Sequence, residues 1–571
     1  MRRACCIGLV ASLAACARPA VHSAPPAVDP CDPAALALVP HRDLIEARVA
    51  KKRGTMGRAM RNMVATSHAL ATRVGQDVLA SGGNAVDAFA AAVLTEDMVL
   101  PGVTSTAGVA GFLVAQPGRP PVYVHGPYRT PTRDGVAWHP GDPVGREVLL
   151  PGAPFALLEA QARYGKLPLS RALAPVIALA QDGFEVDSLL AASIARVPSL
   201  RRSPYAQATY FRDGAPLAVG AHVRLPVLAA TLERLARNGA KELTAGAWAH
   251  AFIAEVQAEG GALALADLSE LRAVIAPALH ARYRGHDVYT ASSTSYGGRK
   301  LLASLAVLEH ASPERLRPIE ASADALGLFL RTHRAVEAEA WVRDPAVIGA
   351  VLEQKLADRA PRLWDAVANE RPTAAPTVEG GSHSSSVIVV DEGGLVVVGT
   401  HTIESANWGE GLFVGGFPLG VSTAHMASVD GVLVDPLSAT LVYDGLAPWL
   451  AMAVYGTGLH PADVQLLSGV VDQHRDVETA VLAPRLGWFE FDLARGTADT
   501  GVNLLDPRVP PAVTCQLGAL GKTLRQTAEP GYPPGFLDLG FPTMVEITGS
   551  GATRTLRGMT PEWMNGVAAG N

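Results

Sequence analysis

SSSVIVVDEGGLVVVGTHTI, residues 384–403, places two short apolar runs on either side of the tripeptide Glu392-Gly393-Gly394. Valine-rich runs of this length that are joined by a glycine-containing turn predict a β-hairpin. The region before the hairpin has a different character. The chain is therefore predicted to change near residue 380 from a mainly helical part to a β-rich part.

The upstream region carries helical patterns that close at glycine. Between residues 150 and 345, apolar residues recur with helical spacing in four segments that a glycine follows. These segments are PFALLEAQARYG (154–165), ALAPVIALAQDGF (172–184), PVLAATLERLARNG (226–239) and AWAHAFIAEVQAEGG (247–261). Earlier in the chain, a helical pattern closes at Gly82-Gly83, and an alanine-rich helix is predicted from Asn84, buried against a sheet.

The first residues have the features of an export signal. Arg2 and Arg3 precede an apolar run that is too short to span a bilayer. LAAC at 13–16 resembles the bacterial lipobox, in which the signal is cut before a cysteine that receives lipid; an ordinary secretory signal is the alternative. On the lipobox reading, residues 1–15 are the signal peptide, Cys16 is lipidated and residues 16–54 form a flexible tether. The protein is then anchored to a bacterial envelope membrane, on the periplasmic or outer-membrane side.

The composition narrows the range of partners. The 571 residues include 49% hydrophobic and 18% charged residues, enough to bury a large core, and the net charge is −6 without charged blocks. A nucleic-acid partner is therefore not expected. The chain lacks CxxC and HExxH motifs, and we expect neither a metal nor a cofactor. Cys31 and Cys515 are the cysteines left after the signal and Cys16, and they form either a disulfide or two free thiols.

Several segments, in order and spacing, resemble the γ-glutamyltransferase family of N-terminal nucleophile hydrolases, from about residue 60 to the C-terminus. The segments are GGNAVDA (82–88), LPG (150–152), YGKLP (164–168), PVIALAQDGFEV (175–186), ARYRGHDVYTASSTSYGG (281–298), VVDEGGLVVVGTHTIESANWGEG (389–411), PLSAT (436–440) and GVAAG (566–570). The resemblance implies an α+β fold, a four-layered αββα sandwich. It also implies one precursor that cuts itself into large and small subunits, which stay together.

The cut should fall just before the hairpin. Such enzymes use a hydroxyl nucleophile whose proton is taken by the free α-amino group of the same residue, so self-cleavage must precede turnover. Counting back from Asp391 without gaps places the nucleophile at Ser384; aligning His383 and the preceding glycines instead favours Ser382. We prefer Ser384, because an insertion within a strand would turn the following side chains to the other face.

This choice divides the chain into a large-subunit region, residues 55–383, and a small-subunit region, residues 384–571, which is 188 residues long (571 − 383). The family nucleophile is a threonine, so serine is a departure, although it is chemically competent. The alternative is that the serines merely begin a strand and that the precursor is never cut.

The resemblance assigns further site residues. Thr400 and Thr402 match threonines on the strand beside the nucleophile, the second of which hydrogen-bonds it. Gly456 falls in the glycine pair whose N–H groups stabilise the oxyanion, with Thr457 in place of the second glycine. Three further residues, Arg129, Glu404 and Ser438, match positions that bind the donor. Arg129 resembles the arginine that grips the donor's α-carboxylate, Ser438 matches the first of two carboxylate-binding serines, and Glu404 stands where the family often has asparagine at the donor's amino end.

The largest departure concerns the donor's ammonium group. The family carries an acidic pair where this chain has Ala427 and Ser428, and Ala439 replaces the second serine of PLSAT. The loss of a charge-assisted bond should weaken binding of an ammonium group, unless Asp430 or Glu404 substitutes.

Three hypotheses follow. The first is an enzyme that cleaves γ-glutamyl amides such as glutathione through an acyl-enzyme on Ser384. The second is an acylase of the same fold with another acyl-amide donor. The third is a catalytically inactive, lipid-anchored homologue with a binding role.

Overall fold

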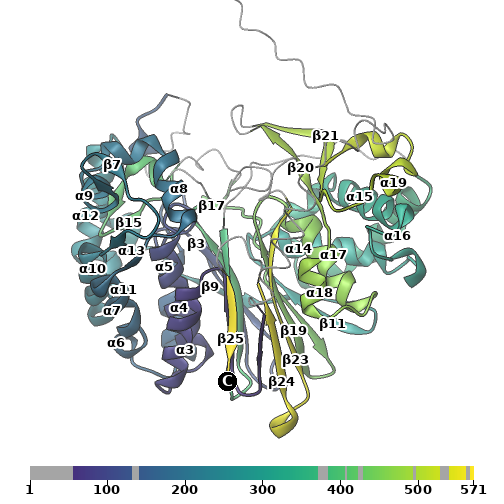
Figure 1. The fold of residues 1–571 in the computed structure, drawn as a ribbon, viewed down its shortest axis with the longest axis horizontal. Helices are drawn as coiled ribbons and strands as arrows, with labels where there is room; N and C mark the ends of the chain where they lie inside the picture. The colour runs from purple at the N-terminus through teal and green to yellow at the C-terminus, as the bar shows by residue number, and fades with distance from the viewer. Residues whose placement is uncertain are drawn as a thin grey trace, which may run out of the picture.

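The computed structural model describes residues 56–130, 141–370, 384–404, 408–421, 428–492, 497–526, 539–560 and 566–571. Two seven-stranded antiparallel sheets lie face to face, and helices cover the outer face of each (Figure 1). This arrangement confirms the predicted four-layered αββα sandwich. Each layer buries its apolar side against the next, which is the general solution for amphipathic elements.

The first sheet contains the predicted hairpin at its centre. Its order is β25 (Val567–Gly570), β2 (Met63–Thr66), β12 (Ser384–Val390), β13 (Val396–Thr402), β3 (Val109–Ala115), β4 (Val122–Gly126) and β9 (Val274–Pro277). The hairpin β12–β13 is confirmed. The predicted division near residue 380 is incomplete, however, because β2, β3, β4 and β9 precede it in the chain. A central hairpin needs hydrogen-bonding neighbours on both sides, and the earlier part of the chain provides them.

The second sheet is built from the later part of the chain together with three earlier strands. Its order is β1 (Gly57–Ala59), β24 (Thr555–Met559), β23 (Phe541–Thr548), β19 (Ala447–Tyr455), β18 (Thr440–Asp444), β11 (His286–Thr290) and β10 (Leu279–Tyr283). Ile388 and Val390 of the first sheet share a core with Leu441 and Ala453 of the second. The even-numbered side chains of β12 therefore point between the sheets.

One helical layer covers the first sheet. It comprises α3 (Ala69–Ala80), α4 (Ala85–Val99), α5 (Ala153–Tyr164), α6 (Leu169–Ala172), α7 (Ala174–Asp182), α8 (Ser188–Arg196), α9 (Pro204–Tyr210), α10 (Pro226–Asn238), α11 (Ala240–Thr244), α12 (Ala247–Ala258) and α13 (Leu265–Ser269). As predicted, a glycine directly follows α5, α7 and α10, whereas Glu259 follows α12 and precedes Gly260.

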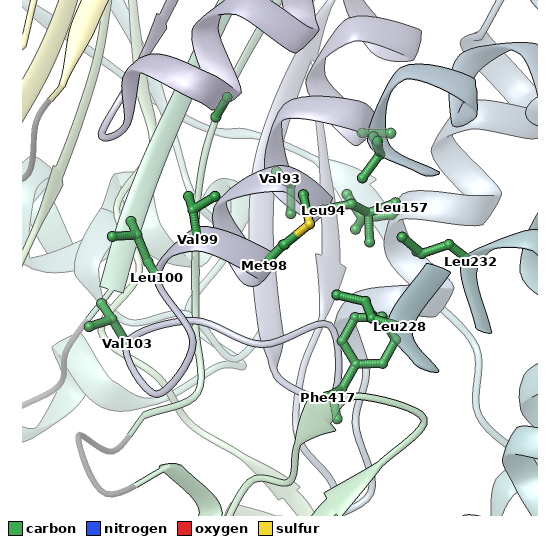
Figure 2. Close-up of a cluster of buried hydrophobic side chains, with 14 of the residues drawn as sticks. Val93, Leu94, Met98, Val99, Leu100, Val103, Leu157, Leu228, Leu232 and Phe417 are labelled. Carbon is green, nitrogen blue, oxygen red and sulfur yellow. The ribbon is translucent and has the colours of Figure 1, made fainter. Parts of the chain in front are cut away.

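The alanine-rich helix α4 lies at the centre of this layer. Asn84 caps it, because its side-chain oxygen accepts from the backbone N–H groups of Val86 and Asp87. All of its residues are buried. Figure 2 shows its apolar side chains beside α5, α10 and Phe417. The prediction of a buried alanine-rich helix is confirmed.

The other helical layer covers the second sheet with α14 (Gly297–Leu308), α15 (Ala323–Glu337), α16 (Gly349–Ala368), α17 (Leu459–Val471), α18 (Val477–Leu482) and α19 (Pro511–Cys515). A smaller sheet of β20 (Leu486–Asp492), β21 (Thr497–Leu505) and β22 (Leu524–Gln526) adjoins it. Leu450 and Met452 of β19 share a core with Leu466 and Leu467 of α17. The two helical layers thus have separate cores, and a third core lies between the two sheets.

Candidate active site

The hairpin places Ser384 directly opposite Thr402. The two are Cα partners at the open end of the β12–β13 pair, and Ser386 with Thr400 is the next pair on the same face. Directly paired residues of antiparallel strands share a face, so the Ser384 and Thr402 side chains lie on the same side of the sheet. The gap-free count from Asp391 chose Ser384, and the family resemblance expects Thr402 to hydrogen-bond it; both roles stay predictions. The alternative nucleophile Ser382 and its neighbour His383 lie outside the described residues.

This face looks into the space between the two sheets. The Ser386 and Thr543 hydroxyl oxygens lie 2.7 Å apart, and Thr543 belongs to β23 of the second sheet. Ser384 and Thr402 are both buried. The Thr400 hydroxyl is also buried, without a hydrogen-bond partner in the described part of the chain. The predicted nucleophile and the two threonines are therefore on one buried, polar face.

Glu404 lies immediately beyond this pair of strand ends. Its backbone N–H donates to the Thr402 hydroxyl over 2.8 Å, and its φ of 60° is in the left-handed region. Tyr128 donates to the carbonyl of Ile403. Burial raises the pKa of Tyr128 well above its ordinary value, and the Glu404 charge raises it further. The backbone of Glu404 thus orients Thr402, and its carboxylate is close to the strand ends.

Gly456 follows β19 in a conformation that suits glycine, with a φ of 88°. Tyr455, the residue before it, is buried beside the carboxylate of Glu96, and both its burial and that charge raise its pKa. The backbone N–H of Ser67 donates to Glu96, and the hydroxyl of Ser67 accepts from the backbone N–H of Ser386. Gly456 is thereby brought towards the start of β12. Its assignment to an oxyanion hole stays a prediction.

Ser438 is fully buried, and its hydroxyl donates to the carboxyl group of Asp463 on α17. Burial raises the pKa of Asp463 well above its ordinary value, although the hydrogen bond from Ser438 opposes this. Ala439, which follows Ser438, packs in the core between the sheets. Sequence reasoning did not find Asp463.

Arg129 is half-buried on a segment that pairs with Leu150 and Val432. Its guanidinium makes no hydrogen bond or ion pair within the described residues. Its role in binding the donor's carboxylate stays a prediction. Of the residues considered for an ammonium group, Ser428 and Asp430 are exposed and Ala427 lies outside the described residues.

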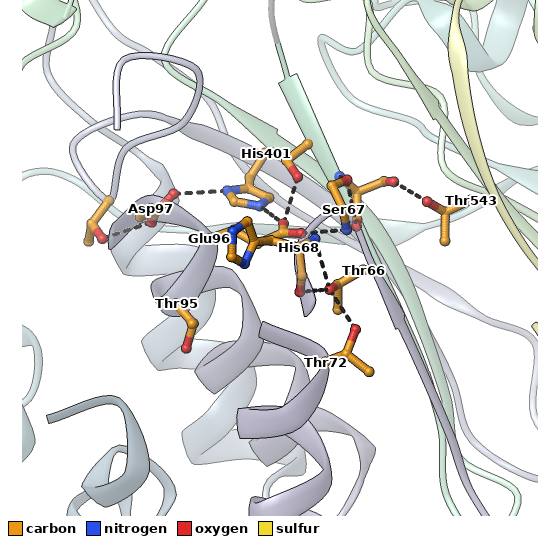
Figure 3. Close-up of polar contacts among 12 residues, drawn as sticks. Thr66, Ser67, His68, Thr72, Thr95, Glu96, Asp97, His401 and Thr543 are labelled. Atoms are coloured by element: carbon orange, nitrogen blue, oxygen red, sulfur yellow. Dashed lines mark hydrogen bonds and ion pairs between the residues drawn. The ribbon is translucent and has the colours of Figure 1, made fainter. Parts of the chain in front are cut away.

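The opposite face of the same strand ends holds a set of buried polar residues that sequence reasoning missed. Figure 3 shows His401 between Glu96 and Asp97 of α4, with Ser67 beside Glu96. His401 Nε2 lies 2.7 Å from Glu96 and His401 Nδ1 lies 3.0 Å from Asp97. The available signal was the pair of adjacent acids in a helix predicted to be buried, because buried carboxylates require partners.

Other sequence predictions concern the termini, the cysteines and metals. Cys515 is disulfide-bonded; Cys31, like Cys16 and the signal region, lies outside the described residues. No helix in the described ranges is both long and apolar enough to cross a membrane. Within those same ranges, no group of three or more histidine, cysteine, aspartate or glutamate residues is placed to hold a metal ion.

Comparison with known proteins adds independent evidence. The Escherichia coli K12 glutathione hydrolase proenzyme is 28% identical over 381 residues, which cover 63% of this chain and 65% of that protein. The match thus spans slightly under two thirds of that relative's length. The acylase ACY 1 proenzyme of Pseudomonas sp. SE83 is 27% identical over 503 residues, covering 81% of this chain and 87% of the relative. These relatives are enzymes, and their names are those of precursors.

The fold has solved counterparts. The cephalosporin acylase from Bacillus halodurans superposes with a TM-score of 0.76 at 22% identity, covering 91% of this chain and 98% of that one. The sequence profile of the gamma-glutamyltranspeptidase family matches residues 71–428, more than half of the chain. This match includes α4, the hairpin β12–β13 and Glu404. It confirms the predicted family: the chain belongs to the gamma-glutamyltranspeptidase family.

Proposed function

We propose that this protein is a self-cleaving amidohydrolase or acyltransferase that uses Ser384 as its N-terminal nucleophile. The observation that carries the proposal is the pairing of Ser384 with Thr402 at the buried end of β12–β13. The cut before Ser384 exposes an α-amino group beside the hydroxyl, and an amine with a pKa near neutrality is suited to accept the hydroxyl proton.

The reaction then runs in two steps. The Ser384 oxygen attacks the donor carbonyl while its proton passes to the α-amine, and the backbone N–H groups near Gly456 stabilise the oxyanion. The departing amine takes that proton, which leaves an acyl ester on Ser384. Water, or an acceptor amine, repeats the sequence on the ester and releases the acid or a new amide. Thr402 orients the serine hydroxyl throughout.

The first candidate donor is a γ-glutamyl amide such as glutathione. Arg129 supports it, because a guanidinium that makes no hydrogen bond or ion pair within the described residues can form a bidentate bond to an α-carboxylate. Glu404 provides an acidic group near the strand ends for the donor's ammonium. The name of the Escherichia coli relative, a glutathione hydrolase, agrees with this choice.

The second candidate is an acylase whose donor lacks the γ-glutamyl amino end. The bond from Ser438 to Asp463 favours it, because a hydroxyl that donates to a protein carboxyl does not donate to a substrate carboxylate. The exposed Ser428 in place of an acidic residue favours it too. The ACY 1 relative is named an acylase.

Processing and location complete the proposal. Residues 1–15 form a lipoprotein signal, Cys16 carries lipid, and residues 16–54 tether the protein to a bacterial envelope membrane. Residues 55–383 and 384–571 are the large and small fragments, which stay together after the cut. Their association is consistent with the first sheet, in which β12 and β13 of the small fragment pair with β2 and β3 of the large one.

A denaturing gel and two anilide substrates test these alternatives. The gel must be run with reductant, because Cys515 is disulfide-bonded and a bridge could hold two fragments together. Two bands support the enzyme, whereas a single uncut band would favour the inactive, lipid-anchored homologue with a binding role. Release of p-nitroaniline from a γ-glutamyl anilide supports the first donor. Release only from anilides of other acyl groups rejects it in favour of the acylase.

A further inference from the structure

Two adjacent carboxylates, Glu96 and Asp97, lie in the last turn of a helix that is buried along its whole length. Burial of a carboxylate is costly unless it is paired. The C-terminal end of a helix carries partial negative charge, which adds to the cost. The remaining side chains of α4 are almost all apolar, so these two acids need a specific partner from another element.

His401 of β13 is that partner. Its two ring nitrogens each face a carboxylate, Nε2 at 2.7 Å from Glu96 and Nδ1 at 3.0 Å from Asp97. Only the protonated imidazolium can donate to two ionised carboxylates at once. Burial lowers the pKa of His401, but the charges and hydrogen bonds of Asp97 and Glu96 outweigh it and raise the pKa to about 9. The ring therefore carries a positive charge at neutral pH.

The remaining bonds of the two acids reach other strand ends. Glu96 also accepts from the Ser67 backbone N–H and from the Ser385 hydroxyl, each over 2.7 Å. Asp97 accepts from the Thr106 hydroxyl over 2.8 Å. One helical turn thereby connects the end of β2, the start of β12, the end of β13 and the segment that leads into β3.

These contacts lie directly behind the proposed nucleophile. Ser385 and His401 are Cα partners, and they are the immediate chain neighbours of Ser384 and Thr402. Because side chains alternate along a strand, the first pair faces α4 while the second faces the space between the sheets. The bonds to Glu96 fix the backbone on which Ser384 and Thr402 stand.

We propose that Glu96, Asp97 and His401 are positioning residues for the nucleophile, holding the ends of β12 and β13 in the register that places Ser384 opposite Thr402. They touch neither the donor nor the reacting atoms. The proposal rests on the proposed function, because it assumes that Ser384 cuts the chain and then carries the acyl group. It predicts that both steps slow when the cluster is broken, even in a protein that stays folded.

The test compares Glu96→Gln with the matched control Glu337→Gln. Glu337 is equally buried and accepts from Lys300 and Arg343, but it lies in the helical layer on the second sheet. Self-cleavage is followed over time in freshly purified full-length protein, and melting temperatures are measured in parallel. Glu96→Gln should slow the cut by at least about tenfold, whereas Glu337→Gln should leave its rate within about twofold at a similar loss of stability.

Ser385→Ala supplies a variant that removes one hydrogen bond and is expected to fold. It should lower kcat several-fold with KM nearly unchanged, because Ser385 faces away from the donor. Its effect in combination with Glu96→Gln should be smaller than the product of the two single effects, since both remove the same contact.

The outcomes separate this proposal from the proposed function. If the wild type is cut and Glu96→Gln is cut equally fast, the positioning role is wrong while the function stands. If both glutamate variants slow in step with their melting temperatures, the cluster acts only through stability and the proposal is overturned. An uncut wild type would overturn the proposed function and this inference with it.

Discussion

The two faces of the hairpin β12–β13 differ in charge although they share a backbone. The face between the sheets presents the small neutral hydroxyls of Ser384 and Thr402, whereas the face towards α4 presents Ser385 and the ion-paired His401. The reacting group must face the donor, and the backbone that carries it needs strong, fully satisfied bonds. The alternation of a strand provides both within two residues.

The largest expected effect comes from the face between the sheets. Ser384→Ala should leave the precursor uncut and lower turnover by at least about 10³-fold, because no other group supplies the nucleophile. The measurement is a reducing gel together with anilide release.

Ser382→Ala is the matched control, two residues away, and it should be cut and active at nearly the wild-type rate. If Ser384→Ala is cut and turns over while Ser382→Ala does neither, the nucleophile is Ser382. The comparison of the two faces of β12–β13 then no longer holds.

On the face towards α4, His401 should make the free energy of unfolding depend on pH. His401 has a folded pKa of about 9, above its ordinary value, so its contribution is fully present below about pH 6.5 and is lost as the pH rises through 9. The loss in the free energy of unfolding should be on the order of 3 kcal/mol. Denaturant melts of the wild type at several pH values measure it.

His401→Gln provides the control for that measurement. It should be less stable than the wild type at pH 7, because two buried carboxylates lose their cation, and it should lack the decline between pH 7 and 9.5. The neighbouring titratable groups, Tyr128 and Tyr455, have pKa values raised well above this range by burial first and by acidic neighbours second. An equal decline in His401→Gln would contradict the charged state of His401.

An intermediate effect is expected at the donor end of the site. Arg129→Lys should raise KM for a γ-glutamyl anilide by about tenfold or more with a smaller change in kcat, since a lysine cannot form the bidentate bond. An acyl anilide without a carboxylate serves as the control donor and should be unaffected. An equal rise in KM with both donors would show that Arg129 does not bind the donor's carboxylate.

The smallest effect is expected from Ser438→Ala. Its hydroxyl is buried and donates to Asp463, so kcat/KM for either donor should change by less than about threefold. A loss of tenfold or more that is confined to γ-glutamyl donors would show that Ser438 binds the donor carboxylate after all. That result would strengthen the γ-glutamyl candidate over the acylase.

Local patterns in the sequence predicted the local structure. The valine runs around Glu392-Gly393-Gly394 predicted the hairpin, and the Gly82-Gly83 pair with Asn84 predicted where α3 ends and α4 begins. A gap-free count from Asp391 chose Ser384 and the family resemblance chose Thr402, and the two lie opposite each other because their strands are close in the chain.

Contacts between distant parts of the chain were not predictable in this way. His401 meets Glu96 across about 300 residues of sequence, and neither neighbourhood indicates the other. The bond from Ser438 to Asp463 depends on the packing of α17 against the second sheet. The strands before residue 380 pair with the hairpin in one sheet. A central hairpin needs hydrogen-bonding neighbours, but periodicity alone does not show which residues provide them.

The N-terminal sequence and intact mass of the small fragment test the central claim most directly. The account predicts that the purified, reduced protein yields a fragment that begins at Ser384 and ends at Asn571. A single uncut chain, or a fragment that begins at Ser382, would contradict the assignment of Ser384 as the self-cleaving nucleophile.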